Sequence, residues 1–121
     1  MTRQILYVFT LFIIIAFASA CGSSSSPSSP SATNADVTIQ IQGDRGSSSY
    51  APNPTTMRVG QTVAWHNADS TTHNATQDAN GFATGTIVAG AVSSPIMMST
   101  AGTLTYHCTI HPGMIGTITV Q

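Results

Sequence analysis

The chain carries very little charge. Only 6% of its 121 residues are charged, with three Lys or Arg against four Asp or Glu. Such a composition provides no basic field to attract phosphate and no acidic run to attract a cationic partner. We therefore expect no nucleic-acid ligand.

Helix signals are also scarce, and no internal repeat is present. Beyond the first twenty residues the sequence is rich in Thr, Ser, Gly and Val, which favour strands and turns. A chain of this length has room for one compact domain. We expect that domain to be all-β.

The first 20 residues predict an export signal. Arg3 supplies a positive charge, and residues 5–18 form an apolar run of 14 residues, too short to span a bilayer comfortably. An Ala-Ser-Ala cleavage site at residues 18–20 directly precedes Cys21. This arrangement resembles the lipobox of bacterial lipoproteins, which implies lipidation of Cys21, while Ala-Ser-Ala also suits ordinary signal peptidase.

A Ser- and Pro-rich tract follows the cysteine. Residues 21–31 contain seven Ser and two Pro, which cannot bury a core and are typical of a flexible tether. We assign residues 1–20 to a signal peptide, 21–35 to the lipidated cysteine and linker, and 36–121 to the folded domain. The protein is thus expected to be exported to the periplasmic or cell-surface side, and to meet a membrane only through a lipid anchor.

Alternation of apolar and polar residues predicts a series of short strands. They are residues 37–42, 55–59, 62–67, 73–77, 94–98, 103–108 and 116–120. Gly60 and Gln61 predict a tight hairpin turn, and the last two strands predict a terminal hairpin. Seven or eight short strands without helices between them favour a Greek-key β-sandwich.

A loop near the C-terminus concentrates metal-binding side chains. Cys108, His111 and Met114 follow one another at intervals of three residues, and Cys108 has no disulfide partner if the first cysteine is processed. Thiolate, imidazole and thioether are donors that suit copper. Two imidazoles and a thiolate with a weak axial Met accept both Cu(I) and Cu(II), as a one-electron site requires. We expect the second imidazole from His73, which precedes Asn74.

The folded domain resembles the cupredoxins, the blue copper proteins of the plastocyanin and amicyanin group. The His-Asn pair at residues 73–74 begins 35 residues before Cys108, as a similar pair precedes the Cys loop in that family. Residues 82–87, with Gly90, resemble the family's Phe-x-Ser-Gly-x-Leu segment and the glycine that follows it. The resemblance extends over roughly residues 36–121.

The resemblance implies a ligand set and a role for each ligand. The spacing between His111 and Met114 equals that of amicyanin, whereas Thr72 stands where these proteins often have Pro. Asn74 would tie the two ligand loops together, and the ring edge of His111 would reach solvent. One copper ion per chain would be held by His73, Cys108, His111 and Met114.

The expected function is a mononuclear type 1 copper protein that moves single electrons between redox partners, with no catalytic residue. The alternative is a copper carrier or storage protein that uses the same ligands. A copper oxidase or reductase would need additional His-x-His pairs, which the sequence lacks, and a binuclear site would need a second loop cysteine where Pro112 stands. Partners are expected to dock on apolar surface around the His111 edge, and the protein is expected to be a monomer.

The remaining histidines and an adjacent pair of methionines are expected to be structural. Strand alternation places His107 on the face opposite Cys108, and His66 on the face opposite Trp65. Of Met97 and Met98, at least one is expected to pack in the core.

Overall fold

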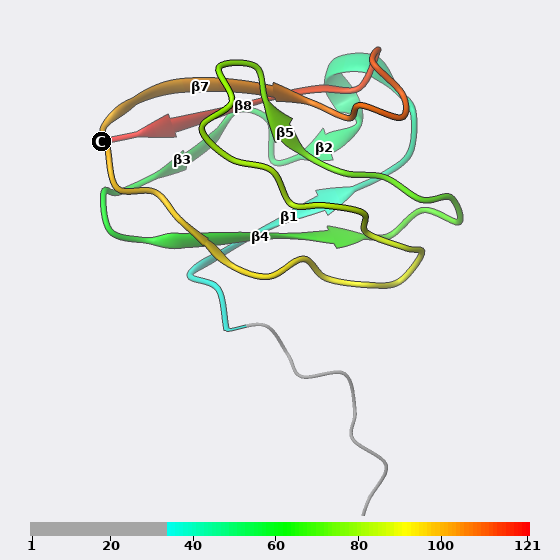
Figure 1. The fold of residues 1–121 in the computed structure, drawn as a ribbon, viewed down its shortest axis with the longest axis horizontal. Helices are drawn as coiled ribbons and strands as arrows, with labels where there is room; N and C mark the ends of the chain where they lie inside the picture. The colour runs from blue at the N-terminus through cyan, green and yellow to red at the C-terminus, as the bar shows by residue number, and fades with distance from the viewer. Residues whose placement is uncertain (1–33) are drawn as a thin grey trace, which may run out of the picture.

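The computed structural model describes residues 34–121, which form two sheets packed face to face (Figure 1). The signal peptide, Cys21 and nearly all of the linker lie outside the described residues. Within residues 34–121, no helix is long and apolar enough to cross a membrane. The elements are β1 (Val37–Ile41), the short 3-10 helix η1 (Gly46–Ser48), β2 (Tyr50–Ala51), β3 (Thr55–Met57), β4 (Thr62–Asn67), β5 (Thr76–Gln77), β6 (Ile96–Met97), β7 (Gly102–His107) and β8 (Ile115–Val120).

The strands form two sheets of four strands each. Their orders are β2-β1-β4-β6 and β3-β8-β7-β5. Alternation in β1 has the expected effect, because Ile39 and Ile41 are fully buried between the sheets while the intervening Gln40 is not. The predicted all-β sandwich of seven to eight strands is confirmed, with eight strands in the described part of the chain.

The predicted hairpin around Gly60 is wrong. β3 pairs in parallel with β8, whereas β4 pairs with β1 and β6 in the opposite sheet. Gly60, with a φ of 89°, therefore lies in a turn that passes from one sheet to the other. A Gly-containing turn between two alternating segments has the same local signature in both cases, and only the pairing of distant strands distinguishes them.

Several other segments differ from the prediction in extent, including the strands predicted over residues 55–59 and 94–98, which shrink to β3 and β6. β2 lies outside the predicted strands, and its Tyr50 pairs with Ile41 of β1. The strand predicted over residues 73–77 shrinks to β5, and His73 keeps only an isolated bridge to Ile87. The terminal hairpin is confirmed, since β7 and β8 pair antiparallel over all six residues of each strand.

An aromatic cluster fills the core near the end of the sandwich that carries the β7–β8 loop. The ring of Tyr106 lies 4.8 Å from that of Tyr50 and 5.6 Å from that of Trp65, and Phe82 packs 5.4 Å from Trp65. Tyr106 covers Gly116, its cross-strand partner, where any Cβ would collide with the ring. The strand that leads into Cys108 is therefore anchored two residues before the cysteine.

Candidate metal centre

Two histidines and a cysteine bring their donor atoms together in one cluster. The β7–β8 loop, which carries Cys108 and His111, lies at the end of the sandwich opposite the C-terminus (Figure 1). The Sγ atom of Cys108 lies 3.9 Å from Nδ1 of His73 and 3.9 Å from Nδ1 of His111, and the two Nδ1 atoms are 3.1 Å apart. His73 and Cys108 are buried, whereas His111 is half-buried. Thus one thiol and two ring nitrogens converge, with only one imidazole near the surface.

These separations fit a single metal ion. Zinc sites give the scale of metal–ligand bonds, with about 2.0–2.1 Å to nitrogen and about 2.3 Å to sulfur. Two donors on opposite sides of one such ion lie about 4.1 Å apart for two nitrogens and about 4.4 Å apart for nitrogen and sulfur. The observed separations of 3.1 and 3.9 Å fall below that limit. Sulfur together with two imidazoles is a donor set that suits copper.

The loop between β7 and β8 brings three of the predicted residues together. The backbone N–H of Cys108 donates to the carbonyl of Met114 (3.1 Å), and the N–H of Met114 donates to the carbonyl of His111 (2.9 Å). Met114 is fully buried at the end of this loop. These two bonds close residues 108–114 into a compact turn, in which Nδ1 of His111 lies 3.9 Å from the Cys108 sulfur.

His73 comes from a different part of the chain, between β4 and β5. Its backbone exchanges two hydrogen bonds with Ile87, of 3.1 and 2.8 Å, which fix its main chain. Its ring is held on the side away from Cys108, where Nε2–H donates to Oδ2 of Asp69 at 2.7 Å. This bond holds the pKa of the Asp69 carboxyl well below its usual range.

Asn74 joins the two segments that carry the donors. Its side-chain Nδ2–H donates to Oγ1 of Thr109 (2.7 Å), and its Oδ1 accepts from the backbone N–H of Thr109 (2.9 Å). Its own backbone N–H points to Sγ of Cys108 at 3.4 Å. Tyr50 in turn donates its hydroxyl hydrogen to the carbonyl of Asn74 (2.7 Å), so the bridge is tied to the aromatic core.

Sequence reasoning missed Asp69 and Tyr50 at this site. An Asp four residues before a histidine is a weak signal, because many such pairs lie on exposed loops and do not meet. Tyr50 could not be linked to Asn74 from the sequence, since the two residues are 24 positions apart and Asn74 lies in the segment between β4 and β5.

The other histidines stay outside the cluster. Nδ1 of His66 lies 2.6 Å from Oε1 of Gln40, and Nδ1 of His107 lies 2.6 Å from Oδ1 of Asp78. Met98 is buried, and Met97 is 63% exposed, so one of the two methionines packs in the core as expected.

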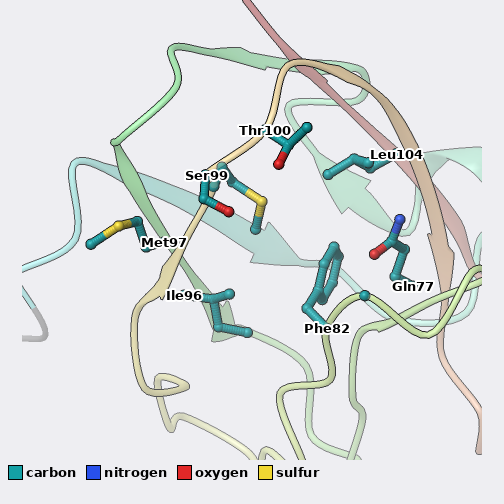
Figure 2. Close-up of a pocket in the computed structure, with 9 residues that line it drawn as sticks. Gln77, Phe82, Ile96, Met97, Ser99, Thr100 and Leu104 are labelled. Atoms are coloured by element: carbon teal, nitrogen blue, oxygen red, sulfur yellow. The ribbon is translucent and has the colours of Figure 1, made fainter.

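A cleft of about 250 Å³ opens on the flank of the sandwich, apart from the cluster. It lies beside the edge strands β5 and β6, and its lining is mostly apolar, including Phe82, Ile96 and Leu104 (Figure 2). None of the clustered donors contributes to this cleft. The chemistry of the described residues is therefore concentrated at the end of the sandwich rather than in its flank.

Sequence and structure comparisons agree with this centre. The family described as copper binding proteins of the plastocyanin/azurin family matches residues 37–121. The chain belongs to this family. Copper, one ion per chain, is accordingly its cofactor.

Among its relatives, plastocyanin of Scenedesmus fuscus is 34% identical over 98 residues, covering 71% of this chain and 100% of the relative. Amicyanin of Paracoccus denitrificans is 34% identical over 74 residues, covering 54% of this chain and 53% of the relative. A purple cupredoxin from Nitrosopumilus maritimus has a similar structure, with a TM-score of 0.63, 30% identity, and coverage of 71% of this chain and 100% of that one. An amicyanin mutant in its reduced Cu(I) form gives a TM-score of 0.61 at 26% identity, with coverage of 70% and 81%. The predicted cupredoxin resemblance is thereby confirmed.

Proposed function

We propose that this protein is a mononuclear type 1 copper electron carrier. The observation that carries the proposal is the convergence of one buried thiol and two imidazole nitrogens, at 3.1 to 3.9 Å, in a chain of the plastocyanin/azurin family. Bound copper supplies the Cu(II)/Cu(I) couple that accepts and releases one electron. The proposed ligands are His73, Cys108, His111 and Met114.

The surroundings of these residues suit electron transfer because they resist rearrangement. The main chain of His73 is fixed by its bridge to Ile87, and Asn74 ties the His73 segment to the β7–β8 loop. Cys108 is fully buried, so water has little access to the thiolate. A site whose donors move little between the two oxidation states loses little energy when the electron arrives.

Redox partners are proposed to dock over the half-buried His111. Ile110 and Ile115 flank this residue along the loop and are 48% and 51% exposed. The formal net charge is only −1, so long-range electrostatic steering is weak. We expect partner electron-transfer rates to change little with added salt, and a steep fall in rate would contradict docking through apolar surface.

The protein is further proposed to work as an exported monomer anchored by lipid at Cys21, with no catalytic residue. Intact-mass measurement of the mature chain distinguishes the two processing routes. A lipid adduct lost in a Cys21→Ser variant would support the anchor. An unmodified chain that begins at Cys21 would favour ordinary signal peptidase and overturn it.

The visible absorption spectrum during titration with Cu(II), beside a Cys108→Ser variant, tests the function. We expect an intense thiolate-to-copper band that saturates at one copper per chain, bleaches reversibly with reductant and is absent from the variant. A pale spectrum, or equal copper binding without Cys108, would refute the electron carrier. That result would favour the copper carrier or storage protein, which should also release copper readily to an acceptor.

A further inference from the structure

We propose that Asp69 is a positioning residue of the copper site. Its carboxylate holds the His73 ring with Nε2 protonated and Nδ1 free for the metal. It also places a negative charge next to the ring nitrogen that faces away from the metal site, and this charge favours Cu(II) over Cu(I). The inference rests on the proposed function, because it takes His73 as a ligand.

The two nitrogens of the His73 ring have separate partners. Nε2 lies 2.7 Å from Oδ2 of Asp69 and 3.0 Å from Oγ1 of Thr71, which donates its own hydrogen to Asp69, whereas Nδ1 faces Cys108 and His111 at 3.9 and 3.1 Å. An ionised carboxylate only accepts hydrogen bonds, so Nε2 must carry the hydrogen. In the neutral ring Nδ1 then bears the lone pair, which is the form a metal requires.

Asp69 is itself held in place. Its backbone N–H donates to Oδ1 of the fully buried Asn67 (3.1 Å), and Oδ2 accepts a second bond from the hydroxyl of Thr71 (2.7 Å). Asn67 also donates to the carbonyls of Thr71 (2.7 Å) and Ile87 (2.9 Å). Gly43 leaves room for the carboxylate, since a Cβ there would lie 3.2 Å from Oδ2. The position of the carboxylate is therefore set by Asn67, Thr71 and Gly43 as well as by its contact with His73.

The chain contains a similar pair that serves as a matched control. Nδ1 of His107 lies 2.6 Å from Oδ1 of Asp78, with side-chain exposures of 33% and 49%. In the Asp69 pair the imidazole is 1% exposed and the carboxylate 27%. The two pairs share the same chemistry, but only the buried one contacts the cluster of metal donors.

Two substitutions separate the charge from the hydrogen bond. Asp69→Asn retains an oxygen acceptor and the shape of the side chain but removes the charge. Asp69→Ala removes both the charge and the short hydrogen bond, and leaves the Thr71 hydroxyl, at 3.0 Å, beside Nε2. Loss of a hydrogen-bond partner behind a metal ligand commonly costs 10–100-fold in metal affinity, and we expect about this loss of Cu(II) affinity for Asp69→Ala. For Asp69→Asn we expect the ratio of Cu(II) to Cu(I) affinity to fall about tenfold, which raises the reduction potential by about 59 mV.

The test uses the full chain and two measurements on each variant, with thermal unfolding of the copper-free forms as a check on folding. The first is the reduction potential, with Asp78→Asn as the control that removes the same charge from the exposed pair. The second is nitrogen NMR of the diamagnetic Cu(I) form, which reports the ring nitrogen of His73 that carries hydrogen. We expect hydrogen on Nε2 in the native chain and in Asp69→Asn, with faster exchange of this hydrogen in Asp69→Ala.

The possible failures are distinguishable. A potential that shifts no more in Asp69→Asn than in Asp78→Asn would overturn the charge effect, and unchanged exchange of the Nε2 hydrogen in Asp69→Ala would overturn the positioning role. A normal copper band in a His73→Ala variant would instead overturn the ligand assignment of the proposed function, and this inference with it.

Discussion

Replacement of Gly116 by alanine tests how tightly the strand leading into the metal site is packed. Gly116 lies opposite Tyr106 in the β7–β8 ladder, and an added Cβ would overlap Cζ and the hydroxyl oxygen of Tyr106. The ring cannot withdraw freely, because Tyr50 and Trp65 pack against it with centroids at 4.8 and 5.6 Å. The overlap must therefore be relieved by moving backbone or by displacing several rings.

The expected cost follows from this geometry. Overpacking of a filled core costs typically about 1–3 kcal/mol, and we place Gly116→Ala in the upper half of that range because the opposing atoms belong to a buried ring rather than to a flexible chain end. For a domain of this size, a loss of about 2–3 kcal/mol in the free energy of unfolding lowers Tm by about 10–20 °C.

Thermal unfolding of the copper-free protein measures this loss without the contribution of metal binding. Gly113→Ala is the matched control, since its added Cβ would have Asp44 Oδ1 as its nearest neighbour, at 3.7 Å. We expect the control to stay within about 0.5 kcal/mol of the native chain, as exposed positions usually do. Equal Tm values for the two alanine variants would refute the tight packing of Tyr106.

Three further predictions concern side-chain hydrogen bonds of Asn74 and Asp36 and the burial of two tyrosines. Asn74→Ala removes the two hydrogen bonds to Thr109 and should lower the free energy of unfolding by about 1–3 kcal/mol in chemical denaturation, and an unchanged midpoint would contradict this bridge. Asp36 accepts two hydrogen bonds from the first residue of β4, and these bonds lower its pKa in the folded protein. The stabilisation of the folded state by Asp36 should therefore be complete above the unfolded pKa of about 3.9, and it should disappear as pH falls through the folded pKa. The Tm difference between the native chain and Asp36→Asn should accordingly shrink in acid, and a difference independent of pH would exclude the effect. Burial raises the pKa of Tyr50 and Tyr106 in the folded protein. The stabilisation of the folded state by the two neutral rings should therefore decline as pH rises above the unfolded tyrosine pKa of about 10. Tyrosinate absorbance from either ring at a lower pH than alkaline unfolding would contradict this.

The sequence by itself determined the features that depend on neighbours along the chain. Alternation in β7 and β8 specified the terminal hairpin, because a short loop between two amphipathic strands leaves antiparallel pairing as the available arrangement. The same loop carries Cys108, His111 and Met114, so the sequence spacing alone marked these three residues as candidate donors of one site. The class of fold and the candidate donors therefore follow from local patterns in the amino-acid sequence.

Only the tertiary structure decided the features that join distant segments. It assigned β3 and β4 to opposite sheets despite the turn at Gly60, and it brought His73 to within 3.9 Å of the Cys108 sulfur from 35 residues away. It also placed the Asp69 carboxylate behind the His73 ring. The physical reason is that periodicity and turn residues record only local conformational preference, whereas strand pairing and side-chain convergence depend on which surfaces become buried together when the two sheets pack.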